Sequence, residues 1–185
     1  SRYSIPNGQV SLTGNRYDDL IAGGSSTVSL SFQQGLVDLG GSPNEALDAQ
    51  TADTAGSFHK VSLSLSRLQA LTQRLSLYAN VTGQLASKNL DSSEKLYLGG
   101  EDGVRAYPTN EGGGSEGLLA HFETRVHLRG GFDLTGFLDW GDVHFNRDTG
   151  FPGAPTGNVE VLKGGGAAVA WAAPFGLSLR LAVAH

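Results

Sequence analysis

The main pattern in this chain is a strict alternation of apolar and polar residues. In Ser26–Gln34, for example, Val28, Leu30 and Phe32 alternate with serine, threonine and glutamine. Successive side chains of a strand point to opposite faces, so this pattern predicts strands with one apolar and one polar face. About eight such strands are expected: Asn7–Thr13, Ser26–Gln34, Phe58–Leu68, Arg74–Ala86, Leu118–Arg129, Phe132–Trp140, Val159–Ala172 and Leu177–His185.

The connections between these strands alternate in length. The expected strands have about 9–13 residues, whereas the strands of ordinary sheets have roughly 5–6. Long strands, short turns on one side and long loops on the other are typical of an antiparallel transmembrane β-barrel, with apolar residues facing lipid and polar residues facing a wet lumen. The short turns are expected near Ala70, Gly130 and Phe175, and the long loops at Asp38–Ser57, Ser87–Gly117 and Asp142–Asn158.

Two segments between strands have weaker signals. The residues Gly14–Gly24 have the composition of a turn, and a short helix is compatible with Asn44–Ala49.

A soluble β-sandwich or lipocalin-like barrel would also show this alternation of apolar and polar residues. The polar face of Leu118–Arg129 favours the membrane barrel, because its charged and titratable residues suit an aqueous lumen better than a sandwich. These residues are His121, Glu123, Arg125 and His127.

Composition excludes several classes of function. The formal net charge of −5 argues against a nucleic-acid binder. The chain has no cysteine, and therefore no disulfide framework or thiolate metal site. It contains no apolar run of about 18 residues, so no transmembrane helix is predicted. The absence of an initial methionine and of a signal peptide indicates an internal or processed piece of a longer protein.

The sequence offers little support for catalysis or for a cofactor. His121 and His127 are six residues apart on one strand, about 20 Å at ~3.3 Å per residue, so they cannot share a metal. No Gly-x-Ser-x-Gly motif is present. Gly112–Gly117 is not followed by Lys-Ser/Thr, so it is no phosphate loop. Glu123 and Asp139 could form a hydrolytic carboxylate pair, but we expect no enzyme, metal or cofactor.

The stretch Leu96–Tyr107 stands out from the alternating strands. Its glycines allow tight turns or a close approach of another chain, and a single arginine follows them. Beyond Pro108, the glycine-rich run Glu111–Gly117 is predicted to be a flexible far end of the loop. The residues of interest are Gly99, Gly100, Gly103, Val104, Arg105, Ala106 and Tyr107.

Arg105 is the sharpest candidate for a functional residue. If the loop folds inward, the guanidinium needs a carboxylate partner. Alternation places Asp139, within Phe137–Gly141, and Glu123 on the polar face. We therefore predict that Arg105 pairs with Asp139, with Glu123 as second acceptor. The alternative is an exposed, solvated arginine of little energetic value.

The segment Leu90–Tyr107 resembles the signature of the two-partner secretion transporters, the haemolysin secretion/activation proteins of the ShlB/FhaC/HecB type. These belong to the same superfamily as the BamA barrel-assembly proteins. In this family an external loop with a Val-Arg-Gly-Tyr/Phe tip folds into the pore. Its arginine pairs with the aspartate of a Phe-x-Asp-x-Gly motif. The matching positions here are Val104–Tyr107 and Phe137–Gly141, with Phe137, Asp139 and Gly141 as the motif residues.

The resemblance implies a fold and a function. Residues 1–185 would be the carboxy-terminal part of a barrel of about sixteen strands, with loop 87–117 folded into the lumen. The protein would be a monomeric pore in the bacterial outer membrane, in contact with lipid, secreting an unfolded partner exoprotein of the haemolysin or adhesin type. Ala106 replaces the family glycine; if that position needs φ > 0, alanine costs on the order of 1 kcal/mol.

Two other functions stay open at this point. The first is a BamA-type factor that assembles or inserts outer-membrane proteins, since it shares the superfamily. The second, from another class, is a soluble β-barrel that binds a ligand, because such barrels alternate as well.

Overall fold

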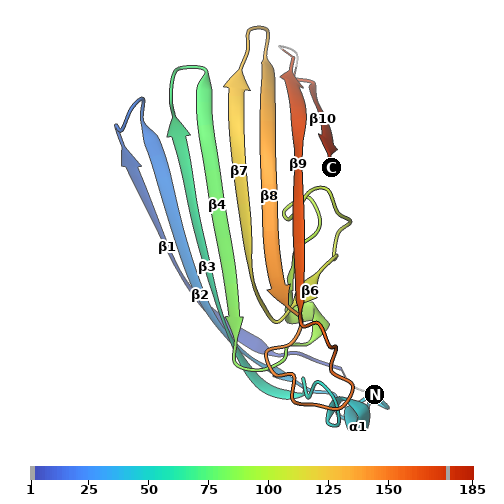
Figure 1. The fold of residues 1–185 in the computed structure, drawn as a ribbon. Helices are drawn as coiled ribbons and strands as arrows, with labels where there is room; N and C mark the ends of the chain where they lie inside the picture. The colour runs from blue at the N-terminus through green and yellow to red at the C-terminus, as the bar shows by residue number, and fades with distance from the viewer. Residues whose placement is uncertain (1–2, 174–175) are drawn as a thin grey trace.

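One antiparallel sheet dominates the computed structural model, which describes residues 3–173 and 176–185 (Figure 1). Its eight strands lie in the order β1-β2-β3-β4-β7-β8-β9-β10, so each strand pairs with its neighbours along the chain once the short strands β5 and β6 are set aside. All pairings are antiparallel, which confirms the predicted fold class. The strands are β1 (Asn7–Asp18), β2 (Gly24–Val37), β3 (Gly56–Ala70), β4 (Leu75–Ala86), β7 (Glu116–His127), β8 (Phe132–His144), β9 (Val159–Ala172) and β10 (Ser178–Ala184).

The first hairpin is longer than predicted. β1 continues to Asp18, which pairs with Gly24, so most of the segment expected to be a turn is strand. Pairing with β2 overrides the turn composition here, because β propensity depends strongly on the neighbouring strand. The carboxylate of Asp18 also accepts two hydrogen bonds from Arg67 of β3, at 2.6 and 2.9 Å, which ties β1 to β3 at this end of the sheet.

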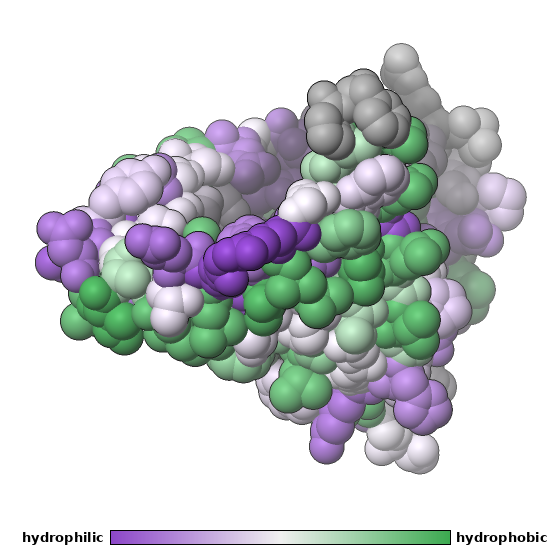
Figure 2. Space-filling view, turned by 90° about the horizontal axis from the view of Figure 1, so that it is seen from above, coloured by the Kyte–Doolittle hydropathy of each residue, from purple (hydrophilic) through white to green (hydrophobic). Residues whose placement is uncertain are grey.

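The two faces of the sheet differ in chemistry. Apolar residues of one face are exposed, including Leu30 at 44%, Leu63 at 40% and Phe122 at 44%. Figure 2 shows apolar side chains gathered along one side of the sheet and hydrophilic side chains on the other. A sandwich would seal the apolar face against a second sheet, and no second sheet covers these residues in the part of the chain described. The apolar face therefore requires an apolar environment from outside the chain.

The connections follow the predicted alternation of length (Figure 1). Short turns join β3 to β4 and β7 to β8 at one end, and three long loops lie at the other. The first long loop carries α1 (Glu45–Asp48), inside the segment where a helix was expected. Pro174 and Phe175, within the third expected turn, lie outside the described residues.

The structure contains, within residues 3–173 and 176–185, no helix with the length and hydrophobicity that a membrane crossing requires.

The sheet is curved but does not close on itself. Within the described residues, β1 pairs only with β2, and β10 pairs only with β9. Each end strand therefore has one edge of backbone N–H and C=O groups without a strand partner, which is a template for another strand. Eight strands are present as predicted, although β10 has only 7 residues, and they form an open sheet rather than a complete barrel.

Candidate functional site

The loop between β4 and β7 folds back over the polar face of β7, β8 and β9. It contains the short 3-10 helix η1 (Ser92–Glu94) and a two-stranded sheet of β5 (Leu96–Tyr97) and β6 (Gly113–Gly114). Its tip turns back at Gly103, whose N–H donates to the carbonyl of Gly100 at 3.1 Å. The next N–H, of Val104, donates to the carbonyl of Leu98 at 2.6 Å. Short backbone bonds thus give the tip a fixed shape.

The far end of the loop differs from the flexible run that the sequence predicted. Gly113 and Gly114 form β6, and Ser115 has no exposed surface. A Cβ at Gly113 would lie 2.5 Å from the ring of Tyr97, and one at Gly114 would lie 2.5 Å from Cβ of Val143. The glycines are explained by close packing, which any larger residue would prevent, and not by a need for mobility.

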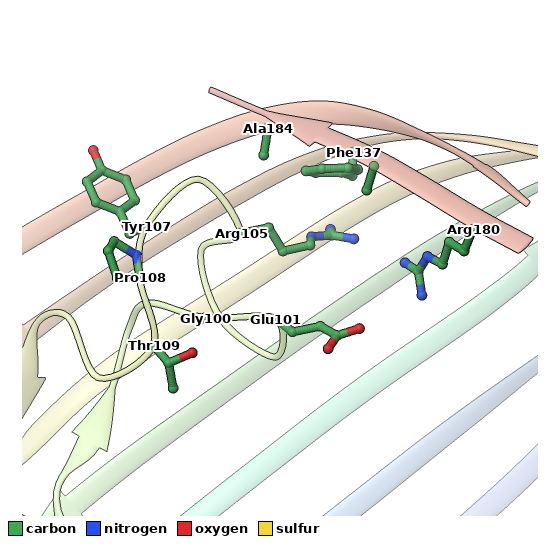
Figure 3. Close-up of a pocket in the computed structure, with 10 residues that line it drawn as sticks. Gly100, Glu101, Arg105, Tyr107, Pro108, Thr109, Phe137, Arg180 and Ala184 are labelled. Atoms are coloured by element: carbon green, nitrogen blue, oxygen red, sulfur yellow. The ribbon is translucent and has the colours of Figure 1, made fainter.

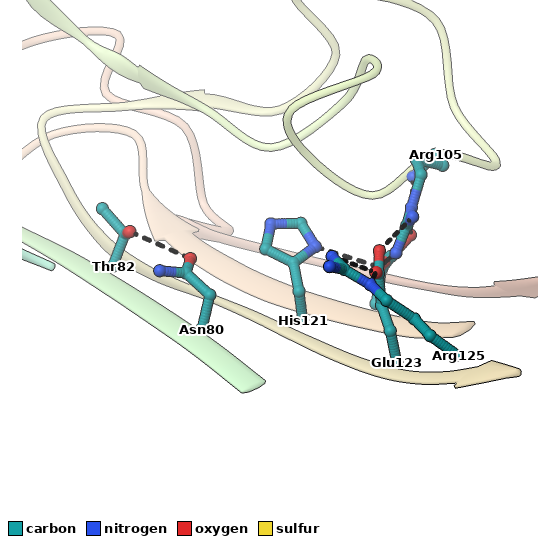
Figure 4. A network of polar contacts seen from close by, with 7 residues as sticks. Asn80, Thr82, Arg105, His121, Glu123 and Arg125 are labelled. Atoms are coloured by element: carbon teal, nitrogen blue, oxygen red, sulfur yellow. Dashed lines mark hydrogen bonds and ion pairs between the residues drawn. The ribbon is translucent and has the colours of Figure 1, made fainter. Parts of the chain in front are cut away.

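Arg105 contacts both Asp139 and Glu123, the two carboxylates predicted as its partners, and Figure 4 shows it beside Glu123. Its Nε and Nη2 donate to the two oxygens of Asp139 at 2.9 and 2.7 Å, and its backbone N–H donates to the same carboxylate at 3.1 Å. Its Nη1 lies 2.6 Å from Oε1 of Glu123. The Asp139 side chain is fully buried and that of Arg105 is 13% exposed. Such bidentate, charge-assisted bonds fix the orientation of the guanidinium as well as its position.

The ion pair belongs to a larger polar network, part of which Figure 4 shows. Nδ1 of His121 lies 2.9 Å from Oδ1 of Asp139, and Nη2 of Arg125 lies 2.7 Å from Oε2 of Glu123. The guanidinium carbon of Arg105 also lies 3.7 Å from the ring centre of Phe137, within range of a cation–π interaction. No buried side-chain nitrogen or oxygen of the described residues lacks a hydrogen-bond partner. Two arginines thus balance two carboxylates.

Behind the ion pair, the loop buries an apolar cluster on the otherwise polar face. Leu98 and Val104 of the loop have no exposed surface. They pack with Leu119 of β7, Val143 of β8 and Leu162 of β9. Sequence reasoning missed this cluster. A signal was present, because the alternation is broken where two apolar residues follow each other, at Leu118-Leu119 and again at Val161-Leu162.

Two strand glycines provide the space into which the loop fits. A Cβ at Gly141, the last residue of the strand motif, would lie 2.7 Å from Cδ2 of Leu98. A Cβ at Gly164 would lie 2.7 Å from Cβ of Ala106 and 3.2 Å from Cγ1 of Val104. Ala106 does not have a positive φ, so the strain considered from the sequence does not arise. Its methyl group instead faces the gap that Gly164 leaves.

The tip also borders an open groove of about 640 Å³ between the loop and β10 (Figure 3). Tyr107 lines this groove and packs partly against the apolar cluster, and Arg180 of β10 faces it from the other side. Among the described residues no group of three or more His, Asp or Glu side chains is arranged to hold a metal ion. The site therefore offers an immobilised arginine beside an open groove of mixed polar and apolar lining, and the polar groups around the arginine hold the loop.

Comparison with known proteins identifies a family and a similar fold. The sequence matches the family model described as haemolysin secretion/activation protein ShlB/FhaC/HecB over residues 3–172. The structure resembles CdiB from Escherichia coli, with a TM-score of 0.64 and 18% identity, covering 96% of this chain and 36% of that chain. CdiB from Acinetobacter baumannii gives a TM-score of 0.44 at 13% identity, covering 99% of this chain and 43% of that chain.

The structural likeness to E. coli CdiB concerns the fold, and this chain spans 36% of that protein's length. No curated protein matches the sequence significantly. The family model covers nearly the whole chain, including both the loop and the strand that carries Asp139. This chain belongs to the haemolysin secretion/activation protein family, ShlB/FhaC/HecB.

Proposed function

We propose that this chain forms part of the wall of a two-partner secretion pore in the bacterial outer membrane. The pore would secrete an unfolded partner exoprotein of the haemolysin or adhesin type. Family membership supports this proposal, and so do the exposed apolar face and the polar opposite face, which suit lipid and water respectively. The observation that carries most weight is the loop held on the polar face by Arg105, Asp139 and Glu123.

The open sheet has a place in this proposal. A lipid-exposed strand edge is not tolerated in a bilayer, because its N–H and C=O groups would lack partners. In the proposed pore, further strands of the full-length protein pair with the free edges of β1 and β10. The pore is then a monomeric barrel, whose outer residues such as Leu30 and Leu63 contact lipid.

The loop divides the proposed lumen into two parts. It covers the inner face of β7–β9, where the charges of Arg105 and Arg125 are balanced by Asp139 and Glu123. The middle of the inner face of β2 and β3 carries short hydroxyl side chains instead, among them Ser29, Ser31, Ser62 and Ser64. An unfolded polypeptide that passes along it meets hydroxyl groups and no unpaired charge of the tip network. This mechanism requires no nucleotide, no metal and no enzymatic step.

Secretion by the full-length protein with its partner tests this proposal. Asp139→Ala removes three hydrogen bonds from Arg105, and we expect it to reduce the amount of secreted partner at least about tenfold, in line with the loss of a buried pair. Asp133→Ala is the matched control: it lies on the same strand and polar face, is 47% exposed and contacts His127. It should secrete normally. The two variants are compared at equal amounts of folded protein in the outer membrane.

Two results would contradict the proposal. The first is normal secretion by Asp139→Ala. The second is a defect in the insertion of other outer-membrane proteins, with normal secretion of the partner, when the full-length protein is depleted. That result would favour a BamA-type assembly factor.

A further inference from the structure

We propose that Lys60 and Glu94 form a second anchor, which holds the root of the loop independently of the tip. Glu94 ends the short helix η1, on the root side of the tip. Its Oε2 lies 2.8 Å from Nζ of Lys60 in β3 and accepts a hydrogen bond from Nε2 of Gln33 in β2 at 2.9 Å. The side chains of Lys60 and Glu94 are only 14% and 11% exposed.

The backbone of the root is held at the same place. The carbonyl of Glu94 accepts from Nζ of Lys60 at 3.1 Å and from Nε2 of Gln84 at 3.3 Å. Gln84 belongs to β4 and also donates to the carbonyl of Ser115, so it joins the outgoing and returning parts of the loop. Glu94 therefore has a polar partner on each of three consecutive strands, whereas the partners of Arg105 lie on β7 and β8.

The two anchors are far apart along the strands. Lys60 pairs with Ala86 of β4. Asp139 of β8 pairs with His121 of β7, which in turn pairs with Asn80 of β4. Six residues of β4 therefore separate the two levels, about 20 Å at ~3.3 Å per residue. They share no residue and no hydrogen bond. Interactions at this separation with no common partner usually act additively.

Independent anchors give the loop a specific mechanical property. Release of the Arg105 ion pair frees the tip while the root stays on β2–β4. The released tip then moves only as far as its attachment to the root allows, and it returns to the same position on β7 and β8. Lys60 and Glu94 are positioning residues in this account. Their importance for secretion rests on the proposed function, but the independence of the anchors is a property of the protein without its partner.

Trypsin can report each anchor separately, because it cleaves after Lys95 beside the root and after Arg105 at the tip. Lys95 is partly buried, and this burial lowers its pKa, as expected for a root packed against the sheet. In the folded full-length protein we expect both sites to be protected. Cleavage of a transiently opened segment follows the population of the open form.

Lys60→Met removes the ammonium and keeps the aliphatic stem. It should increase cleavage after Lys95 at least about tenfold and leave cleavage after Arg105 unchanged, since a partly buried pair loses one member. Asp139→Ala should give the opposite pattern. Glu94→Gln should act as Lys60→Met does, and Lys60→Arg should preserve protection. The control is Arg67→Met, on the same strand as Lys60, which removes an ion pair with Asp18 of β1 and should change neither site.

Two outcomes would overturn this inference. If Lys60→Met or Asp139→Ala exposes both sites together, the loop is one cooperative unit with no separate root anchor. If Lys60→Met and Glu94→Gln leave Lys95 protected, the pair does not hold the root. Because cleavage is measured without the partner exoprotein, failure here is distinct from failure of the proposed secretion function.

Discussion

Two halves of the same inward face differ sharply in composition. One row of paired residues crosses the sheet from β1 to β9 at a single level, and it is hydroxyl-bearing over β1–β4 and apolar or glycine over β7–β9. The row consists of Thr13, Ser29, Ser64, Thr82, Leu119, Gly141 and Leu162. The change occurs where the loop begins to cover the sheet, because Leu119 and Leu162 pack against the loop.

This difference indicates that the chemistry of an inward-facing strand residue depends on whether water or the loop covers it. Where water lies over the sheet, small hydroxyl side chains suffice. Where the loop lies over it, leucines bury apolar area, glycines provide space and Asp139 pairs with a charge. The following variants test whether the covered half depends on the loop in this way, beginning with the largest expected effect.

The largest effect is expected from Arg105→Ala. It leaves the buried carboxylate of Asp139 with only His121 and the backbone N–H of residue 105, and it removes one partner of Glu123. Loss of one member of such a pair typically costs about 3–5 kcal/mol. The loop should then become a rapid target for proteinase K in the folded protein. Arg180→Ala is the matched control, because Arg180 has no ion-pair partner among the described residues, and its removal should not change protection.

A similar or slightly smaller effect is expected from Leu98→Ala, which empties the centre of the apolar cluster. Truncation of a buried leucine costs about 2–5 kcal/mol, depending on how far the cavity collapses. Loop protection from protease measures this cost as well. Leu138→Ala offers the comparison, because Leu138 lies on the outer face of β8 and is 64% exposed. If the two variants lost equal loop protection, burial under the loop would not be what distinguishes the halves.

A smaller effect is expected from Gly141→Ala. The new Cβ would lie 2.7 Å from Cδ2 of Leu98 and 3.1 Å from Cδ1 of Leu119, and overpacking of this kind costs about 1–3 kcal/mol. Gly136→Ala on the same strand places its Cβ where no atom lies within 4 Å. Unfolding in urea should therefore separate the two variants. Equal stability would show that Gly141 does not make room for the loop.

Much of this architecture could be predicted from alternation alone. The apolar pattern located the eight long strands and their two faces, and the same parity placed Glu123 and Asp139 on the face where Arg105 finds them. Alternation works here because each strand is exposed to two different surroundings along its whole length. The extension of β1 to Asp18 was missed, since it depends on pairing with β2.

The parts that could not be predicted depend on contacts between distant segments. Lys60 and Glu94 form an ion pair although they are 34 residues apart in the sequence, and nothing in either local sequence marks them as partners. In the sequence, the glycines of β6 resemble a flexible linker. Only the structure shows that Tyr97 and Val143 pack against them. Glycine serves both mobility and close packing, and only the neighbouring atoms distinguish the two.

The central claim is that the loop tip lies on the inner face of β8 and β9, and a disulfide tests it most directly. Cysteines at Ala106 and Gly164 would place Cβ atoms 2.7 Å apart, so a shift of about 1 Å gives the ~3.5–4.5 Å of a disulfide. The chain has no other cysteine. In the full-length protein in its membrane, we predict that Ala106→Cys/Gly164→Cys forms a disulfide spontaneously. Ala106→Cys/Ala168→Cys, about 13 Å further along β9, should not form one. Free thiols at both positions of the first pair, open to a maleimide in the folded protein, would contradict the account.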